Sequence, residues 1–250
     1  MNMTININNK PCACEPGEYL LDIASRNGIA IPSLCHHDGL RGQACCRVCI
    51  VEVETDGRRS IVTACVYPIE RECAVFTENE NVKRQRRMVL RLLRARAPQS
   101  VEVARLCEEY GAAEVGDRFE KNADGKCILC ALCVEACRSL GTGAIGTAGR
   151  GVGKDVTTPY DEPSLACVGC ASCASVCPTG CIEVGEAGNQ RTIWNKTFPL
   201  VACKNCGAVM GTMMELWRAA QKTGAEDAPV LCEMCRKKAI TDVMAATYGK

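Results

Sequence analysis

Polar and apolar residues alternate at the start of the chain, where MTININN (residues 3–9) predicts a short β-strand. The next stretch, EYLLDIASRNGI (residues 18–29), instead spaces its apolar residues as a helix does. Gly28 stands where this pattern stops, as expected for the end of a helix. A strand followed by one helix is therefore predicted here.

A hairpin is predicted for CIVEVETDGRRSIVTAC (residues 49–65), because two β-rich runs are joined by Asp56 and Gly57. CAVFTE (residues 73–78) predicts a further strand. Residues 1–78 are expected to form a domain of short strands around one helix.

The clearest predicted helix is NVKRQRRMVLRLLRARAP (residues 81–98), with seven basic residues, no acidic residue and a final Pro98. Four apolar side chains can share one face, namely Val82, Val89, Leu92 and Leu93. The basic residues could form a docking surface for an acidic partner or nucleic acid. We favour a linker helix whose arginine stems cover a neighbouring element.

Composition changes the picture, because 22 of the 250 residues are cysteine and aromatic residues make up only 4%. So few aromatic side chains cannot fill several ordinary cores, and such modules are usually held by disulfides or metal. The N-terminus has no secretory signal and the chain has no apolar run long enough for a membrane span, so we expect a cytoplasmic protein whose clustered cysteines bind metal. The net charge of +1 gives no sign of nucleic-acid binding.

The motif C-x2-C-x2-C-x3-C occurs twice, as CILCALCVEAC (residues 127–137) and CVGCASCASVCP (residues 167–178). Two such runs are typical of a ferredoxin with two 4Fe-4S clusters, in which the fourth cysteine of each run binds the other cluster. Buried thiols or disulfides explain a double match poorly. The predicted ligands are Cys127, Cys130, Cys133 and Cys177 for one cluster, and Cys167, Cys170, Cys173 and Cys137 for the other.

A 2Fe-2S cluster is predicted nearer the N-terminus, since plant-type sites also combine a loop cysteine, a tight pair and a later cysteine. The predicted ligands are Cys35, Cys46, Cys49 and Cys65. Zinc or free thiols are the alternatives. Cys45 leaves the register open by one residue, and His36 and His37 are expected to face solvent or to lie behind the ligands.

Two further C-x2-C pairs predict a closed four-thiolate zinc site, formed by Cys203, Cys206, Cys232 and Cys235. Rubredoxin-like iron or another 4Fe-4S cluster would use the same donors. The sequence suggests no partners for Cys12, Cys14, Cys73 and Cys181, although the first two could simply occupy a strand.

The segment GTGAIG (residues 141–146) matches a nucleotide-binding pattern, but it follows a cysteine run rather than a strand. We expect it to form backbone turns between the clusters.

Residues 1–185 resemble the iron–sulfur region that begins the large peripheral-arm subunit of complex I. They also resemble the front of iron-only hydrogenases and the diaphorase subunit of NAD-reducing hydrogenases. The resemblance is carried by IPSLCHHDGL, CCRVCIVEVE, KCILCALCVEACRSLGTGAIGTAGRG and CVGCASCASVCPTGCI. It implies a β-grasp 2Fe-2S domain, then a two-cluster ferredoxin domain, and one-electron exchange with a flavin-containing NAD(P)H-oxidising subunit.

One departure from this family lies between the two domains, where members usually carry a histidine and three cysteines for a further 4Fe-4S cluster. Here RARAPQSVEVARLCEEYGA (residues 94–112) offers Cys107 alone, which is expected to be a buried small hydrophobe.

The expected fold is α+β, with a β-grasp domain (1–78), a helical linker (79–119), a two-cluster ferredoxin-like domain (120–188) and a zinc-ribbon-like module (189–250). The expected function is electron transfer between an NAD(P)H-linked flavoprotein and a redox partner such as ferredoxin, a hydrogenase, a formate dehydrogenase or a bifurcating transhydrogenase. No complete catalytic site, nucleic-acid partner or membrane span is expected. The alternative is a non-catalytic zinc scaffold or nucleic-acid-binding protein.

Overall fold

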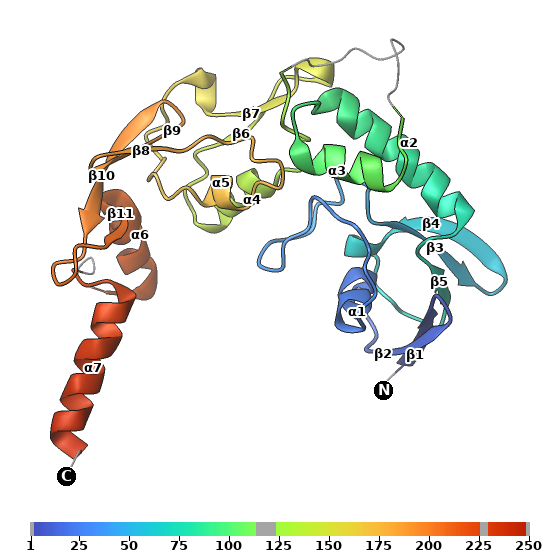
Figure 1. Cartoon of the computed structure of the whole chain (residues 1–250), viewed down its shortest axis with the longest axis horizontal. Coiled ribbons are helices and arrows are strands. Elements are labelled where there is room, and N and C mark those ends of the chain that lie inside the picture. Colours follow the sequence, from blue (N-terminus) through green and yellow to red (C-terminus); the bar gives the residue numbers. More distant parts are fainter. Residues whose placement is uncertain (1–2, 114–123, 226–229, 249–250) are drawn as a thin grey trace.

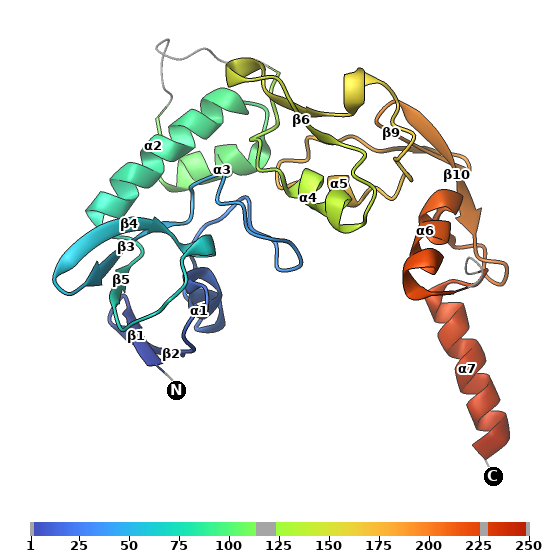
Figure 2. The same cartoon turned by 180° about the vertical axis from the view of Figure 1, so that it is seen from behind.

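The computed structural model describes residues 3–113, 124–225 and 230–248. Figure 1 shows the chain as an arch, with an N-terminal sheet at one end and the C-terminal helix at the other, and Figure 2 shows the arch from behind. The cysteine runs of the middle region lie at the crown of the arch. The predicted boundary between residues 119 and 120 lies outside the described residues, and none of the described helices could cross a membrane.

The N-terminal sheet has five strands in the order β2-β1-β5-β3-β4. β1 pairs with β5 in parallel, and every other pairing is antiparallel. The elements are β1 (Met3–Ile7), β2 (Lys10–Cys14), α1 (Leu20–Arg26), β3 (Ile50–Thr55), β4 (Arg58–Thr63), the 3-10 turn Ala64–Val66 and β5 (Ala74–Phe76). The predicted strands, helix and hairpin are present, and Asp56 and Gly57 have the positive φ of a type I′ turn.

The core of this domain lies between the sheet and α1. Cys12 and Cys14 occupy β2 with both side chains buried, as expected, and Cys73 packs against the same core. These thiols act as small apolar side chains.

Two helices, α2 (Glu80–Arg96) and α3 (Val101–Glu109), follow the sheet and pack against each other. The prediction for the buried face of α2 was partly wrong, because Leu92 is 43% exposed. The buried face follows an i, i+4 row through Val82, Arg86 and Leu90. A periodicity argument counts arginine as polar and therefore misses this row.

The middle region contains short elements around the cysteine runs. They are α4 (Leu132–Ser139), β6 (Gly146–Ala148), the 3-10 turns Gly151–Gly153 and Pro159–Asp161, β7 (Asp155–Thr157) and α5 (Ser172–Ser175). The two runs share a backbone pattern: Leu129 and Gly169 have positive φ, as do Ala131 and Ala171 directly before α4 and α5. The sequence repeat is thus also a conformational repeat.

The C-terminal region has a four-stranded sheet in the order β11-β10-β9-β8, followed by two helices. Its elements are β8 (Gly185–Ala187), β9 (Gln190–Ile193), β10 (Lys196–Ala202), β11 (Val209–Thr212), α6 (Met213–Thr223) and α7 (Glu233–Tyr248). α6 begins with a capping box between Thr212 and Glu215. The Thr212 hydroxyl also donates to the Val168 carbonyl, and Arg218 donates to the Gly141 carbonyl, so this region is tied to both parts of the cysteine repeat.

Candidate metal centres

The structure brings the four predicted N-terminal cysteines together, with every side chain at most 3% exposed. The Cys49 and Cys65 sulfurs are 3.4 Å apart, and the Cys46 backbone N–H donates to Cys35 Sγ at 3.4 Å. Cys45 is exposed whereas Cys46 is buried, which favours Cys46 as the member of this set. Four convergent sulfurs in a dry loop form a donor set suited to a small iron–sulfur cluster.

The thiols in this site influence one another's ionisation. Hydrogen bonds donated by the Cys46 and Cys65 thiols lower the pKa of Cys35. The contact with the Cys65 thiol, whose sulfur lies 3.4 Å away, likewise lowers the pKa of Cys49 to about 7, although burial opposes this effect. The same contacts raise the pKa of Cys46 and Cys65, so the pocket favours the metal-binding thiolate at two of the four positions and disfavours it at the other two.

Of the two histidines beside Cys35, His37 is exposed and His36 is half-buried. His36 lies 3.8 Å from carboxylate oxygens of both Asp22 and Asp38. His37 Nδ1 accepts the backbone N–H of Gly39 at 3.1 Å. Both imidazoles therefore have polar contacts outside the set of four thiols.

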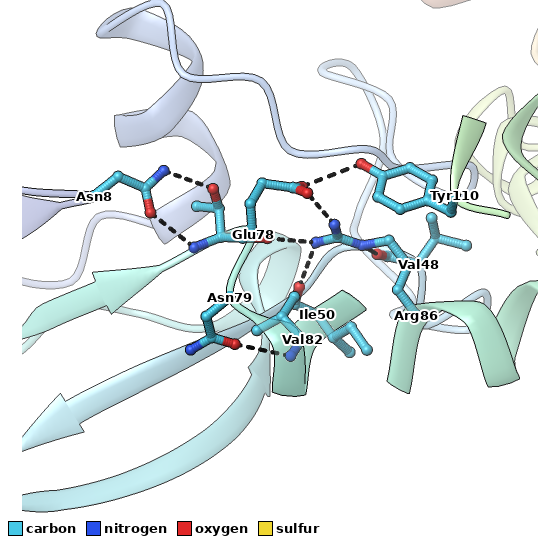
Figure 3. Close-up of polar contacts among 9 residues, drawn as sticks. Asn8, Val48, Ile50, Glu78, Asn79, Val82, Arg86 and Tyr110 are labelled. Atoms are coloured by element: carbon cyan, nitrogen blue, oxygen red, sulfur yellow. Dashed lines mark hydrogen bonds and ion pairs between the residues drawn. The ribbon is translucent and has the colours of Figure 1, made fainter. Parts of the chain in front are cut away.

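Figure 3 shows a contact that the sequence did not predict: the guanidinium of Arg86 lies against the cysteine loop. Arg86 is fully buried, and its Nε and Nη2 donate to the carbonyls of Val48 at 3.1 Å and Ile50 at 2.8 Å. These two residues flank Cys49 in the sequence. Arg86 thus holds the backbone on both sides of a candidate ligand.

The buried charge of Arg86 has its own partners. Nη1 donates to Glu78 Oε1 at 2.6 Å, and Nη2 also donates to the Thr77 carbonyl at 3.1 Å. The guanidinium carbon lies 4.9 Å from the centre of the Tyr110 ring, whose hydroxyl donates to Glu78. These carbonyl and carboxylate acceptors compensate the buried charge of Arg86, so the guanidinium can be accommodated at the junction of the sheet and both helices.

A cavity of about 370 Å³ lies at the first cysteine run. The cavity is lined by all four cysteines predicted to bind the first 4Fe-4S cluster, namely Cys127, Cys130, Cys133 and Cys177. Burial raises the pKa of the Cys130 and Cys133 thiols to about 12. The thiolates therefore need a positive partner in this cavity, such as the metal ions of a cluster.

A second, smaller cavity is lined by the other predicted set, Cys137, Cys167, Cys170 and Cys173. The fourth cysteine of each run thus lines the cavity of the other run. This exchange is the arrangement that the spacing predicts for a two-cluster ferredoxin.

The glycine-rich segment after the first run wraps around Cys137. Its Sγ accepts the backbone N–H of Ala144 at 3.2 Å and lies 3.0 Å from the Thr142 hydroxyl oxygen. Gly141 and Gly143 have positive φ in this turn. The segment forms backbone turns at a cysteine, as the sequence analysis expected.

Cys181 is a fifth thiol in the first cavity, which the sequence analysis left without partners. Its backbone N–H donates to Cys177 Sγ at 3.3 Å, and its thiol donates to Cys127. Cys107 is buried as expected, with its sulfur 3.6 Å from the Leu90 carbonyl oxygen, in the same hydrophobic core as Cys35, Cys46 and Cys130.

The N-terminal site and the two cavities are linked in space by shared hydrophobic cores. One core contains Cys35 and Cys46 of the N-terminal site together with Cys130 of the first cavity. The next core contains Cys133 of the first cavity and Cys167 of the second. Packed protein therefore connects each site to the next.

The C-terminal cysteines form a more compact site, in which the four sulfurs of Cys203, Cys206, Cys232 and Cys235 all lie within 4.8 Å of one another. The backbone N–H of Cys232 donates to Cys203 Sγ at 3.3 Å. This bond is the largest of the contacts that lower the pKa of Cys203 to about 6. The side-chain amide of Asn205 donates to Cys235 Sγ. The four predicted donors thus lie close enough together to hold a metal ion.

Comparisons with known proteins agree with the first two regions. Residues 1–80 match the family described as a 2Fe-2S iron-sulfur cluster binding domain, and residues 122–184 match the 4Fe-4S dicluster domain. The chain carries both iron–sulfur domains. The resemblance predicted from the sequence is therefore confirmed.

Several relatives have NAD(P)-linked names. The NADP-reducing hydrogenase subunit HndD of Solidesulfovibrio fructosivorans is 32% identical over 215 residues, covering 74% of this chain and 36% of the relative. The NADPH-Fe(3+) oxidoreductase subunit alpha of Geobacter sulfurreducens is 29% identical over 227 residues, covering 82% of this chain and 26% of the relative. This chain thus corresponds to only about a third or a quarter of these relatives.

A solved structure shares the fold over part of the chain. The crystal structure of NAD+-reducing [NiFe]-hydrogenase in the H2-reduced state matches with a TM-score of 0.54 and 26% identity. The match covers 62% of this chain and 74% of the hydrogenase chain.

Proposed function

We propose that this protein is an electron-transfer subunit of an NAD(P)H-linked oxidoreductase complex. When bound, its iron–sulfur clusters would supply one-electron carriers, which a flavin-containing NAD(P)H-oxidising subunit could load singly. The names of the hydrogenase and oxidoreductase relatives support this class of partner. The redox partner at the other end would be ferredoxin, a hydrogenase, a formate dehydrogenase or a bifurcating transhydrogenase. Its cysteine usage favours the cytoplasm.

The observation that carries the proposal is the sharing of hydrophobic cores between consecutive sites. Cys35 and Cys130 belong to one core although they come from different domains. Relatives usually carry a further cluster between these two domains, whose ligands this chain lacks. Here apolar side chains of α2 and α3, including Leu90 and Leu106, fill the interface instead. The chain's own residues thus keep water away between neighbouring sites.

The proposed ligands are those of the sequence analysis. A 2Fe-2S cluster would bind Cys35, Cys46, Cys49 and Cys65, one 4Fe-4S cluster Cys127, Cys130, Cys133 and Cys177, and the other Cys167, Cys170, Cys173 and Cys137. The convergence of the first set and the two cysteine-lined cavities support these assignments.

The C-terminal set is proposed to bind zinc. With Zn–S bonds of about 2.3 Å, tetrahedral ligand sulfurs lie about 3.8 Å apart, which agrees with sulfurs that all lie within 4.8 Å. A cube of four irons would separate its ligands further. The 189–250 region would then be a zinc-ribbon-like module.

The basic helix α2 favours an internal role over nucleic-acid binding. Arg86 is buried, Arg94 donates to the Pro98 carbonyl at 2.6 Å, and Arg96 donates to the Val152 carbonyl at 3.0 Å. These cations are engaged with the protein's own backbone, which supports the linker interpretation.

The decisive experiment is anaerobic purification of the native complex, followed by identification of its subunits and metal analysis of this chain. We expect about ten irons and matching acid-labile sulfide, with about one zinc. The isolated chain should not oxidise NADH or NADPH, and NADH should reduce its clusters once the flavoprotein is restored. About two irons would contradict the dicluster assignment, and NADH–viologen activity of the isolated chain would contradict the subunit role.

A further inference from the structure

The turn between β9 and β10 is built from an unfavourable residue. Trp194 and Asn195 connect the strands, with φ of 52° and 56°. A two-residue turn with two positive φ values prefers Asn-Gly, and Asn195 tolerates this conformation. A bulky tryptophan in the left-handed region costs about 1–2 kcal/mol. Such a residue persists where its surroundings hold it, often at a functional site.

The side chain of Trp194 lies at both cluster cavities. It lines the first together with Cys127, Cys130, Cys133 and Cys177, and it lines the second together with Cys137, Cys167, Cys170 and Cys173. Its indole Nε1 is 3.5 Å from Cys173 Sγ and donates a hydrogen bond to it. An indole nitrogen can only donate, so it interacts most strongly with a thiolate.

The residue after the turn fixes this arrangement. Lys196 Nζ donates to the carbonyls of Ser164 at 3.0 Å and Cys167 at 3.1 Å, and it lies 4.9 Å from the centre of the Phe198 ring. Phe198 in turn packs against Gly169, where an added Cβ would lie 2.7 Å from the ring. The hairpin is therefore attached directly to the loop that carries Cys167 and Cys170.

We propose that Trp194 is a positioning residue that raises the reduction potential of the cluster in the second cavity. The proposal rests on the function proposed above. An N–H group donated to a ligand sulfur stabilises the reduced cluster, which carries one more negative charge than the oxidised one. Trp194 lies beyond residues 122–184, the part that matches the dicluster family, so the C-terminal region supplies this influence.

The test compares Trp194→Phe with Trp217→Phe in the full-length chain purified with its clusters. Phenylalanine keeps an aromatic ring in the turn but has no N–H group, whereas Trp217 is 47% exposed on α6. Midpoint potentials are measured by redox titration followed by electron paramagnetic resonance. Loss of a signal in Cys170→Ala identifies the cluster of the second cavity.

We expect Trp194→Phe to lower the ratio of reduced to oxidised cluster in the second cavity about tenfold at the parent midpoint, equivalent to 59 mV. The other two clusters and the Trp217→Phe protein should keep their parent potentials. All signals present but no change in Trp194→Phe would overturn the proposal. Absence of 4Fe-4S signals from the parent would instead refute the proposed function.

A second measurement does not depend on the Trp194→Phe protein being stable. The chain has two tryptophans, so Trp217→Phe leaves Trp194 as the sole indole fluorophore. Its emission should be strongly quenched by the adjacent clusters and should recover when they are removed by chelation and oxidation. Emission that is unchanged by cluster removal would place the indole away from the cavities and overturn the proposal.

Discussion

The cysteine sets in the middle and at the C-terminus share the C-x2-C unit but differ in how closely their sulfurs converge. Among the described residues, Cys203, Cys206, Cys232 and Cys235 are the one cysteine set with all sulfurs within 4.8 Å. The sets of the middle region surround cavities instead. The separation of the sulfurs therefore distinguishes a site for one ion from a site for several, although the local spacing is the same.

The two regions also differ in what supports the thiols. In the middle region, Cys130, Cys133, Cys167 and Cys173 lie in hydrophobic cores. At the C-terminus, α7 begins between Cys232 and Cys235, and every described residue of this helix is outside the buried core. The middle region can thus draw on apolar packing, whereas the C-terminal end would depend on the metal proposed for its four cysteines.

The largest expected effect tests the exchange of ligands between the cysteine runs. Cys137→Ala should remove about four irons and the same resonance signal that Cys170→Ala removes, since both cysteines line the second cavity. Cys130→Ala should remove a different signal. The control Cys45→Ser changes an exposed thiol and should retain every iron. If Cys137→Ala and Cys130→Ala lose the same signal alone, the exchange is wrong.

The next prediction concerns the compact site. Cys206→Ala should lose about one zinc per chain while iron stays at the parent value, because the C-terminal site is separate from the cluster cavities. α7 should lose helicity, since it starts at this site and has no packed face. Elemental analysis and circular dichroism measure both effects. Cys73→Ala is the control, and loss of about four irons from Cys206→Ala would identify a third cube.

A buried cation gives the third prediction. Arg86→Met leaves the carbonyls of Val48 and Ile50 without their donor. A buried unpaired group costs about 1–3 kcal/mol, so the free energy of unfolding of the N-terminal domain should fall by about 3 kcal/mol. Denaturant unfolding of the full chain, followed through 2Fe-2S absorption, measures this change. Arg84→Met, an exposed position on the same helix, should be nearly neutral. Equal effects from both variants would contradict the anchoring role.

The smallest effect is a pH dependence. A hydrogen bond from Arg26 lowers the pKa of Glu18 in the folded protein. This pair therefore stabilises the fold above the unfolded pKa of Glu18, and the contribution is lost as pH falls through the lower folded value. Because Arg26 is 54% exposed, solvent screening keeps this contribution small. Glu18→Gln should reduce stability more at pH 7 than at pH 3, whereas exposed Glu70→Gln should leave stability unchanged at both; an equal loss at both values would refute the pairing.

The sequence alone predicted the cysteine sets because ligand spacing is a property of the linear chain. It also predicted the Asp56–Gly57 hairpin, whose turn chemistry is local. It could not predict Arg86, since burial of a cation requires carbonyls that come together only in the fold. Trp194 was missed for a related reason, because its turn sequence is unfavourable and its role depends on cavities formed by distant cysteines. Cys181 likewise gains a neighbour in Cys127 through folding alone.

The position of Cys137 has a consequence for biosynthesis. It leaves the ribosome with the first run, but it lines a cavity whose other three cysteines are made later. The first cavity likewise includes Cys177, which is synthesised after the other three cysteines proposed as its ligands. With the proposed ligands, neither cavity has its full set until the second run is made, so cluster delivery would require a chain synthesised through Cys173 for the second cavity and through Cys177 for the first.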